Sequence, residues 1–355
     1  MEPSNSRPGE KKKRKLRIPT VVDTWVCQAI LQVLQQTFDP KFSHHSYGFR
    51  PRKSAHQAIN QARQYVKQGY RFVVDIDLEN FFSQVNHDKL MSEITKTIKD
   101  VKVLKLLRKL LNTGVLSNGL VKASDKGTPQ GNLLSPFLSN IMLDLLDKEL
   151  EKRNHKFCRY TDDCNIYVNS RRAGKRVRTS LTNFIEKQLK LRVNRDKSAI
   201  GKVSRRNFLG FTFIRSKDNP KIKVSPQVIN RFKDVIRALT RAGKWNSTEN
   251  VVQRLVKYSE RWLAYFGQSQ TPTVLSSLAG WLRRKLRCMY WRQWKTAKNR
   301  YKQLRKLGIQ HELAAITVGS GKKQWRMSTS RSVQTALPNS YFHKLGLPKF
   351  TCQTR

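Results

Sequence analysis

Two adjacent aspartates, Asp162 and Asp163, stand in the stretch KFCRYTDDCNIYVN, between two runs that alternate as strands do. Adjacent carboxylates repel each other, so the pair needs either hydration in a turn or a bound cation. A third carboxylate, Asp77, lies in RFVVDIDLENFF, which alternates strictly and predicts a half-buried strand. Asp75 falls on the same face as Asp77, so periodicity alone does not choose between them.

These carboxylates could support nucleotidyl transfer. Strands lying side by side would bring Asp77 close to Asp162 and Asp163. Such a cluster is costly unless a cation occupies it, and Mg²⁺ combines a few carboxylates with water and substrate phosphate. Two Mg²⁺ ions, or Mn²⁺ in their place, could activate a 3′-hydroxyl and stabilise a leaving pyrophosphate. From these residues alone, ordinary turn chemistry and a solvated strand face stay open as alternatives.

The charge balance points to a polyanionic partner. The chain of 355 residues has 71 Lys and Arg against 24 Asp and Glu, a formal charge of +47. Nucleic acid is the leading partner, because released counterions drive such binding, and a membrane surface is the alternative. No apolar run of about 18 residues exists, so we expect no membrane-spanning helix. Five cysteines without a CxxC spacing disfavour zinc knuckles and a disulfide framework and favour a reducing compartment.

The elements that must position the carboxylates follow from apolar spacing. Helical spacing is found at residues 21–38, and again at about 54–68 with Ser54 as the expected N-cap. Beyond residue 220 the texture changes to amphipathic helices rich in Arg and Lys, at about 226–242, 248–266 and 273–298. From about residue 307 the chain mixes short strand-like and polar runs. We therefore expect four parts: a basic N-terminal arm (1–17), fingers and palm (18–219), a helical thumb (220–306) and a basic extension (307–355).

Six motifs carry a family resemblance. In chain order they are SYGFRPRKSAHQAI, VVDIDLENFFSQVNHDKLM, GTPQGNLLSPFLSNIMLDLLDKELEK, RYTDDCNIYV, LRVNRDKS and FLGFTF. Over roughly residues 14–350 the chain resembles the reverse transcriptases of bacterial and organellar group II introns, and ERWLAYF resembles part of their maturase thumb. The resemblance implies an α+β right-hand polymerase with an antiparallel palm sheet, helical fingers and a three-helix thumb. It also implies a cytoplasmic location in bacteria, or an organelle.

The resemblance implies roles for individual residues. Asp77, Asp162 and Asp163 match the metal-binding aspartates, and Phe82 matches an aromatic gate that excludes the ribose 2′-hydroxyl. Lys197 is the candidate general acid for pyrophosphate, with a plain surface lysine as the alternative. Further residues expected near the nucleotide or primer are Arg14, Arg50, Gln130 and Tyr160. The expected RNA-binding residues of the thumb are Arg283, Arg284, Lys285, Arg287, Arg292 and Lys295.

The implied activity is RNA-directed DNA polymerisation together with maturase action in splicing. The implied partners are an RNA template, group II intron RNA, a DNA or RNA primer and deoxynucleoside triphosphates. Two rival functions remain: a splicing cofactor with an idle polymerase site, and a reverse transcriptase recruited to defence or repair. The chain departs from the family pattern at its start, where the N-terminal extension and first finger motifs are expected to be lacking, and at Thr161, which replaces an alanine.

Overall fold

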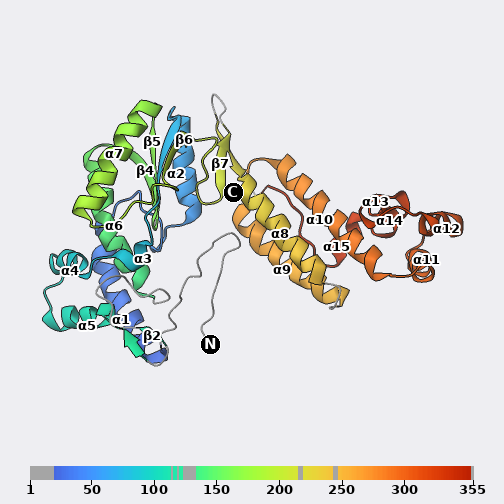
Figure 1. Ribbon diagram of the computed structural model, residues 1–355, viewed down its shortest axis with the longest axis horizontal. Coiled ribbons are helices and arrows are strands. Elements are labelled where there is room, and N and C mark those ends of the chain that lie inside the picture. The colour runs from blue at the N-terminus through green and yellow to red at the C-terminus, as the bar shows by residue number, and fades with distance from the viewer. Residues whose placement is uncertain are drawn as a thin grey trace. The chain divides into compact units, whose positions relative to one another are not determined.

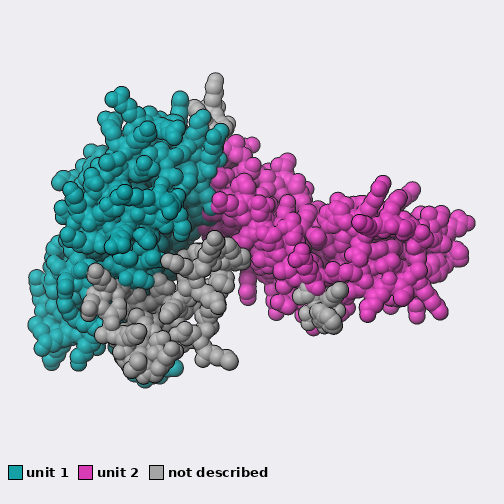
Figure 2. Space-filling view, in the orientation of Figure 1, with its two compact units in different colours: residues 1–209, 217–220 teal, residues 210–216, 221–355 magenta. Residues whose placement is uncertain are grey.

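The computed structural model describes residues 20–112, 115–117, 120–122, 133–214, 219–242 and 247–352. The chain folds into two compact units (Figure 2). Unit 1 comprises residues 1–209 and 217–220, and unit 2 comprises residues 210–216 and 221–355. The fold is the expected α+β right-hand polymerase, with an antiparallel sheet among many helices. No helix in these described ranges has the length and apolar character needed to span a membrane.

Unit 1 is built around a four-stranded antiparallel sheet in the order β4–β5–β1–β6 (Figure 1). The strands are β1 (Phe72–Ile76), β4 (Lys156–Tyr160), β5 (Asp163–Val168) and β6 (Ala199–Lys202), with a separate hairpin of β2 (Val115–Ser117) and β3 (Leu120–Lys122). The helices are α1 (Val21–Phe38), the 3-10 helix η1 (Asp39–Lys41), α2 (Ala55–Lys67), α3 (Phe81–Gln84), α4 (His87–Thr95), α5 (Val101–Asn112), α6 (Ser135–Lys152) and α7 (Arg171–Gln188).

The two faces of this sheet differ because side chains alternate along each strand. Val74 and Ile76 of β1, with Cys164 and Ile166 of β5, are buried in the core that α6 and α7 complete. The opposite face carries Val73 and Asp75 of β1 with Asn165 and Tyr167 of β5, and α2 covers part of it. Figure 1 shows α7 and α2 on opposite sides of the sheet. The predicted half-buried strand with carboxylates on its second face is confirmed, although regular pairing ends at Ile76.

Local capping explains where two helices of unit 1 begin. Thr20 caps α1 by accepting a hydrogen bond from the Asp23 amide, and α1 has the bounds expected from its apolar spacing. Ser54 caps α2, as expected, and its capping box with Gln57 satisfies two backbone donors reciprocally. The α2 prediction is therefore confirmed to within one residue at each end.

Unit 2 contains a short hairpin followed by helices. The hairpin consists of β7 (Phe211–Ile214) and β8 (Lys221–Val224). The helices are α8 (Pro226–Ala242), α9 (Thr248–Phe266), α10 (Pro272–Gln293), α11 (Ala297–Lys306), α12 (His311–Gly319), α13 (Gln324–Met327), α14 (Arg331–Ala336) and α15 (Asn339–Lys344). Phe232 of α8 is fully buried and stacks 5.4 Å from Tyr258, with Trp262 at 4.9 Å, so aromatic rings join α8 to α9.

The C-terminal part of unit 2 differs from its prediction in two ways. The helix expected over 273–298 ends at Gln293, because the chain turns through Lys295 at a φ of 47° and restarts at α11 behind the N-cap Thr296. The expected strand-like extension from residue 307 is helical instead, and its buried Phe350 lies 6.0 Å from Phe232. Helices of six residues are too short to show an apolar period, which explains the error.

Candidate active site

The pairing of β1 with β5 brings two of the predicted aspartates to the same place. Ile76 lies opposite Cys164, so the next positions in the antiparallel register are Asp77 and Asp163. Ile76 and Cys164 both face the core, and alternation therefore assigns Asp77 and Asp163 to the opposite face. Directly opposed residues have Cβ atoms about 5 Å apart, which is within reach of a shared ligand.

Asp162 lies in the tight turn between β4 and β5, where Tyr160 pairs with Asp163. Thr161 holds this turn at a φ of 57°, a left-handed conformation that is unfavourable for a β-branched residue. Its hydroxyl donates to the Tyr160 carbonyl at 2.6 Å. Within the described ranges, no three His, Cys, Asp or Glu side chains form a group that could hold a metal ion.

Asp75, the alternative to Asp77, is engaged elsewhere. Its carboxylate forms an ion pair with the Arg206 guanidinium, and both side chains are less than one-third exposed. Burial raises the pKa of Asp75, and the hydrogen bond and charge of Arg206 oppose that rise. The structure thus separates the two aspartates that periodicity left equivalent, because Asp77 lies at the strand end opposite the paired aspartates whereas Asp75 is tied to a loop.

The segment that carries Lys197 is attached to Asp77 through the backbone. The Asn194 amide donates to the Asp77 carbonyl at 2.9 Å, and the Asp77 amide donates to the Ser198 hydroxyl at 3.0 Å. Lys197 follows in the same turn with an exposed side chain, and its amide donates to the Asn194 side chain at 3.2 Å. The backbone of Lys197 is therefore held close to the backbone of Asp77.

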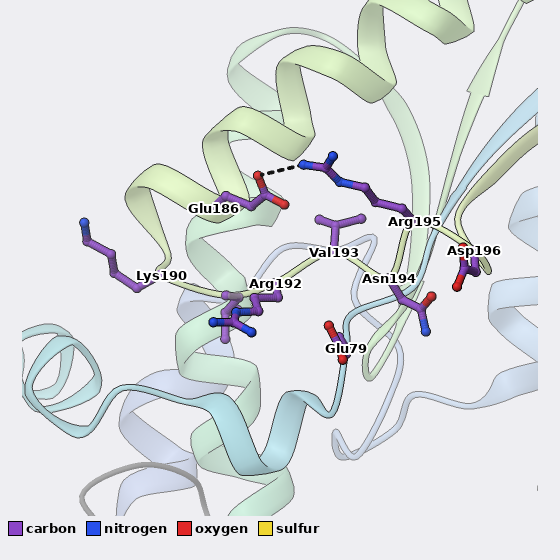
Figure 3. A pocket seen from close by; sticks show the side chains of 9 residues that line it. Glu79, Glu186, Lys190, Arg192, Val193, Asn194, Arg195 and Asp196 are labelled. Carbon is purple, nitrogen blue, oxygen red and sulfur yellow. Dashed lines mark ion pairs between the residues drawn. The ribbon is translucent and has the colours of Figure 1, made fainter. Parts of the chain in front are cut away.

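A cleft of about 670 Å³ runs beside this segment, lined by Glu79 and by residues from Glu186 to Asp196. Figure 3 shows the Glu186 carboxylate facing the Arg195 guanidinium, with 3.7 Å between the paired atoms. Lys190 and Arg192 add positive charge to a wall that also holds Glu79 and Asp196. This mixture of charges is unlike the mostly apolar lining of a small-molecule pocket, so we assign the cleft no ligand.

Phe82 lies in α3, five residues after Asp77. It is half-buried, and its ring meets the ring of Phe81 edge-on with 5.3 Å between centroids. Asn80 precedes α3 in a left-handed conformation, which turns the chain sharply between the strand end and the helix. The short helix therefore keeps Phe82 close in the chain to the strand end that carries Asp77.

The predicted role of Arg50 needs correction. Its side chain is 6 % exposed, and its guanidinium donates to the Asp39 side chain at 2.7 Å and to the Ser43 carbonyl at 2.6 Å. The same guanidinium also reaches the Ser46 carbonyl. These donors are used within the fold, so Arg50 holds a loop and is not kept as a nucleotide ligand. Arg14 and Gln130 lie outside the described residues.

The cations expected to bind RNA lie on α10, except Lys295, which follows it. Some of them lie over an aromatic ring, and others bond backbone carbonyls of the protein. Arg284 stacks over Trp325 with its guanidinium carbon 3.8 Å from the ring centroid, and the Lys285 ammonium lies 5.0 Å from the same ring. Arg283 is half-buried and Lys295 is exposed. Arg284 also donates to the Trp325 carbonyl at 3.0 Å, and Arg287 and Arg292 bond the carbonyls of Leu337 and Thr240. Because Arg287 is also only 8 % exposed, we remove it from the expected RNA contacts.

Sequence reasoning missed a buried arginine beneath the turn. Arg159 is 1 % exposed and forms an ion pair with Asp147 of α6. The strand pattern contained a signal. Arg159 lies two residues after the buried Phe157, so alternation places both side chains on the core face of β4. A charge at such a position needs a buried partner, and Asp147 occupies the buried side of α6 next to Leu146.

Comparison with known proteins shows the family of the chain. The family model described as reverse transcriptase (RNA-dependent DNA polymerase) matches residues 6–213, more than half of the chain. The chain belongs to the reverse transcriptase family. A second model, the group II intron maturase-specific domain, matches residues 229–308. Both matches agree with the resemblance found in the motifs.

Curated relatives extend the family assignment. The chain is 32% identical over 245 residues to protein YkfC of Escherichia coli, covering 58% of this chain and 64% of that protein. It is 36% identical over 154 residues to the group II intron-encoded protein LtrA of Lactococcus lactis, covering 43% and 26%. The chain thus spans less than two-thirds of these relatives. Among solved structures, apo telomerase from Candida tropicalis matches with a TM-score of 0.48 and 12% identity, covering 91% of this chain and 61% of that chain.

Proposed function

We propose that this reverse transcriptase family member is an RNA-directed DNA polymerase of the group II intron type that also binds intron RNA in splicing. The observation that carries the proposal is the register of β1 and β5, in which Ile76 pairs with Cys164. Continued by one position, this register would bring Asp77 to Asp163, beside the turn that holds Asp162. The match to the maturase-specific model over residues 229–308 supports the splicing role. An RNA template, a DNA or RNA primer and deoxynucleoside triphosphates are the proposed partners.

Reverse transcriptases generally use divalent metals, and the residues present fit such an ion. Carboxylate oxygens are the donors that Mg²⁺ prefers, and Asp77, Asp162 and Asp163 supply them at one end of the sheet. Three neighbouring carboxylates repel one another, and a divalent cation among them would offset that repulsion. When bound, two Mg²⁺ ions, or Mn²⁺, would lower the pKa of a 3′-hydroxyl and neutralise a leaving pyrophosphate.

The remaining steps belong to the protein's own side chains. Phe82 would close the space beside the sugar of the incoming nucleotide, and Tyr160 would contact the primer end from the strand that precedes the turn. Lys197 would donate a proton from its ammonium group to the leaving pyrophosphate. Asn194 and Ser198 both bond the backbone of Asp77, and Lys197 lies between them in the chain. This attachment supports the role, because it holds the lysine segment at the end of β1.

Primer extension on an RNA template tests the proposal. We expect the wild type to extend a primer with deoxynucleotides and Mg²⁺ and the Asp162→Ala variant to be inactive, because it lacks one metal-binding carboxylate. Asp196→Ala is the matched control, since it removes an exposed aspartate of the cleft in Figure 3. If the wild type and Asp162→Ala incorporate equally little, the protein is not a polymerase.

Phe82 gives a test of sugar selection. Replacing Phe82 by alanine is expected to raise the incorporation of ribonucleotides relative to deoxynucleotides by about 10-fold to 100-fold, because a smaller side chain leaves room for the 2′-hydroxyl. The measurement is the ratio of kcat/KM for each matched nucleotide pair. Phe82→Tyr keeps a ring in the same place and should retain discrimination. An unchanged ratio in Phe82→Ala would show that another residue selects the sugar.

The basic surface of unit 2 favours a second candidate function, a splicing cofactor whose polymerase site is idle. The surface consists of Trp281 and Trp325 with the cations that lie over their rings: Lys233, Arg237, Arg284 and Lys285. Cations held beside aromatic faces suit phosphates and unstacked bases. None of these residues takes part in the carboxylate site, so RNA binding does not depend on nucleotidyl transfer.

Charge reversal separates the two candidates. Reversing Arg283, Arg284 and Lys285 to glutamate is expected to weaken intron RNA binding at least about 10-fold and to lower its salt dependence. The matched control reverses three exposed cations of α7, Arg171, Arg172 and Lys175, which gives the same change in net charge. Equal losses in both variants would mean that only total charge matters. Splicing that survives Asp162→Ala but fails after the α10 reversal would favour the splicing cofactor.

A further inference from the structure

The guanidinium of Arg159 uses every donor it has inside the palm. Nε donates to Asp147 Oδ1 at 2.7 Å, and Nη2 donates to Asp147 Oδ2 at 2.6 Å and to the Ser46 hydroxyl at 2.7 Å. Nη1 donates to the Asn140 side-chain oxygen at 2.9 Å and to the Thr161 carbonyl at 3.0 Å. Asp147 is fully buried, so this is an ion pair removed from water.

A buried ion pair is weak evidence for stability, because the cost of removing two charges from water can exceed their attraction. What distinguishes this ion pair is that its arginine also donates to the Thr161 carbonyl. The Thr161 carbonyl belongs to the peptide plane that also holds the Asp162 amide, so fixing that oxygen fixes the orientation of the plane. Arg159 therefore acts on the backbone that carries Asp162, at a residue whose φ of 57° is unfavourable without support.

A second contact fixes the same turn from the other side. The loop that contains Gly48 runs beside the edge strand β4, because the Tyr47 amide donates to the Arg159 carbonyl and the Arg159 amide to the His45 carbonyl, both at 2.9 Å. A Cβ atom on Gly48 would lie 2.5 Å from the Thr161 amide nitrogen, closer than real contacts allow. Glycine is therefore required there by close backbone approach.

Asn140 joins the two contacts. Its side-chain oxygen accepts from Arg159, and its side-chain nitrogen donates to the Gly48 carbonyl at 2.8 Å. Both ends of the amide are thus satisfied, and α6 holds the loop and the arginine in one network. We call these five residues the turn seat: Ser46, Gly48, Asn140, Asp147 and Arg159.

We infer that the turn seat is a positioning device that presents Asp162 and Asp163 to Asp77, with Arg159 and Gly48 as positioning residues for nucleotidyl transfer. The inference rests on the proposed function of the three aspartates. A turn that shifts by a fraction of an ångström would keep its fold and lose the approach of its carboxylates to Asp77. The residues that support metal ligands typically change metal affinity when replaced, even though they never touch the ion.

Arg159→Lys and Gly48→Ala test the inference in the full chain. Lysine keeps a charge opposite Asp147 but cannot reach all the acceptors of the guanidinium fork, and alanine pushes against the Thr161 amide. The control is Gly174→Ala in α7, whose Cβ would meet Ile200 at 2.9 Å and so strains the palm far from the turn. Thermal melting ranks the stability of each variant. Mn²⁺ binding, followed by the electron spin resonance of free Mn²⁺, reports the site without catalysis.

We expect both seat variants to melt as folded proteins and to bind Mn²⁺ at least about 10-fold more weakly than Gly174→Ala. Their kcat for single-nucleotide incorporation should fall by at least about 10-fold, with the KM for the nucleotide within about 2-fold of wild type. If both variants match Gly174→Ala in Mn²⁺ affinity and kcat, the seat only supports the fold and the inference is wrong.

Failure of the proposed function gives a different result. A wild type with neither incorporation nor Mn²⁺ binding that depends on Asp162 would overturn the proposed function, and this inference with it. A wild type that binds Mn²⁺ through Asp162 but incorporates nothing would overturn the polymerase alone. In that case the Mn²⁺ affinities of Arg159→Lys and Gly48→Ala still decide for or against the seat.

Discussion

Replacing Asp77 by asparagine is expected to lower the rate of single-nucleotide incorporation about 1,000-fold, the scale of losing a group that contacts the transition state. Asparagine keeps the shape of the side chain and removes its charge, so the fold should persist. The physical reason lies in the proposed metal site, to which Asp77 contributes from the position directly after the Ile76–Cys164 pair of β1 and β5. The measurement is a single-turnover assay at saturating primer and template, with melting temperature recorded beside it.

Asp75→Asn is the matched control for this prediction. Asp75 lies two residues away on the same face of β1, but its carboxylate is paired with Arg206. Losing a partly exposed ion pair costs about 1 kcal/mol or less, so we expect a small drop in stability and incorporation close to wild type. If Asp75→Asn were as inactive as Asp77→Asn, the structure would not distinguish the two aspartates and the assignment of Asp77 would fall.

The sheet and its carboxylates could be predicted because their signals are local. Strict alternation around Val74 and Ile76 predicts both a strand and a polar second face, and the structure has both. The choice between Asp75 and Asp77 could not be made from alternation, because both positions have the same parity. It required the pairing register and the partner Arg206, which lies 131 residues further along the chain than Asp75.

The errors at Arg50 and at the C-terminal end have physical causes of the same kind. Arg50 sits in a motif whose order matches the family, but motif order does not say whether a guanidinium faces a ligand or its own loop. Its hydrogen bonds to Asp39 and Ser43 show that it faces the loop. Beyond residue 307, short helices such as α14 and α15 are stabilised by packing against other helices of unit 2, as when Phe342 of α15 contacts Tyr290 of α10. A window of six residues does not show these packing partners.

The turn seat was missed because its members are distant in sequence and each has an ordinary local explanation. Ser46 and Gly48 read as loop residues, and Asn140 and Asp147 read as polar positions of a helix. Only the fold brings them to Arg159. The strained turn that carries the adjacent aspartates is therefore held by two contacts. The Arg159 guanidinium bonds the Thr161 carbonyl, and the loop at Gly48 lies against the Thr161 amide.

Replacing Asp147 by asparagine is expected to destabilise unit 1 by about 3 to 5 kcal/mol, because it leaves the buried guanidinium of Arg159 without its charge partner. The amide nitrogen of asparagine would also face a guanidinium N–H that in the wild type donates to a carboxylate oxygen. The measurement is the denaturant midpoint with the slope m unchanged, so that the shift reports stability. Arg108→Ala, which breaks an exposed pair with Asp88 in the same unit, is the control and should cost about 1 kcal/mol or less.

The double variant Asp147→Leu with Arg159→Met carries this prediction further. Removing both charges should recover part of the lost stability, since an apolar pair avoids the desolvation cost. Recovery should be incomplete, because Asn140 and the Thr161 carbonyl lose the donor that satisfied them. If the ion pair only held the palm together, the double variant would regain Mn²⁺ affinity along with stability. If the arginine orients the turn, stability returns without the metal affinity, because methionine has no donor to offer the Thr161 carbonyl.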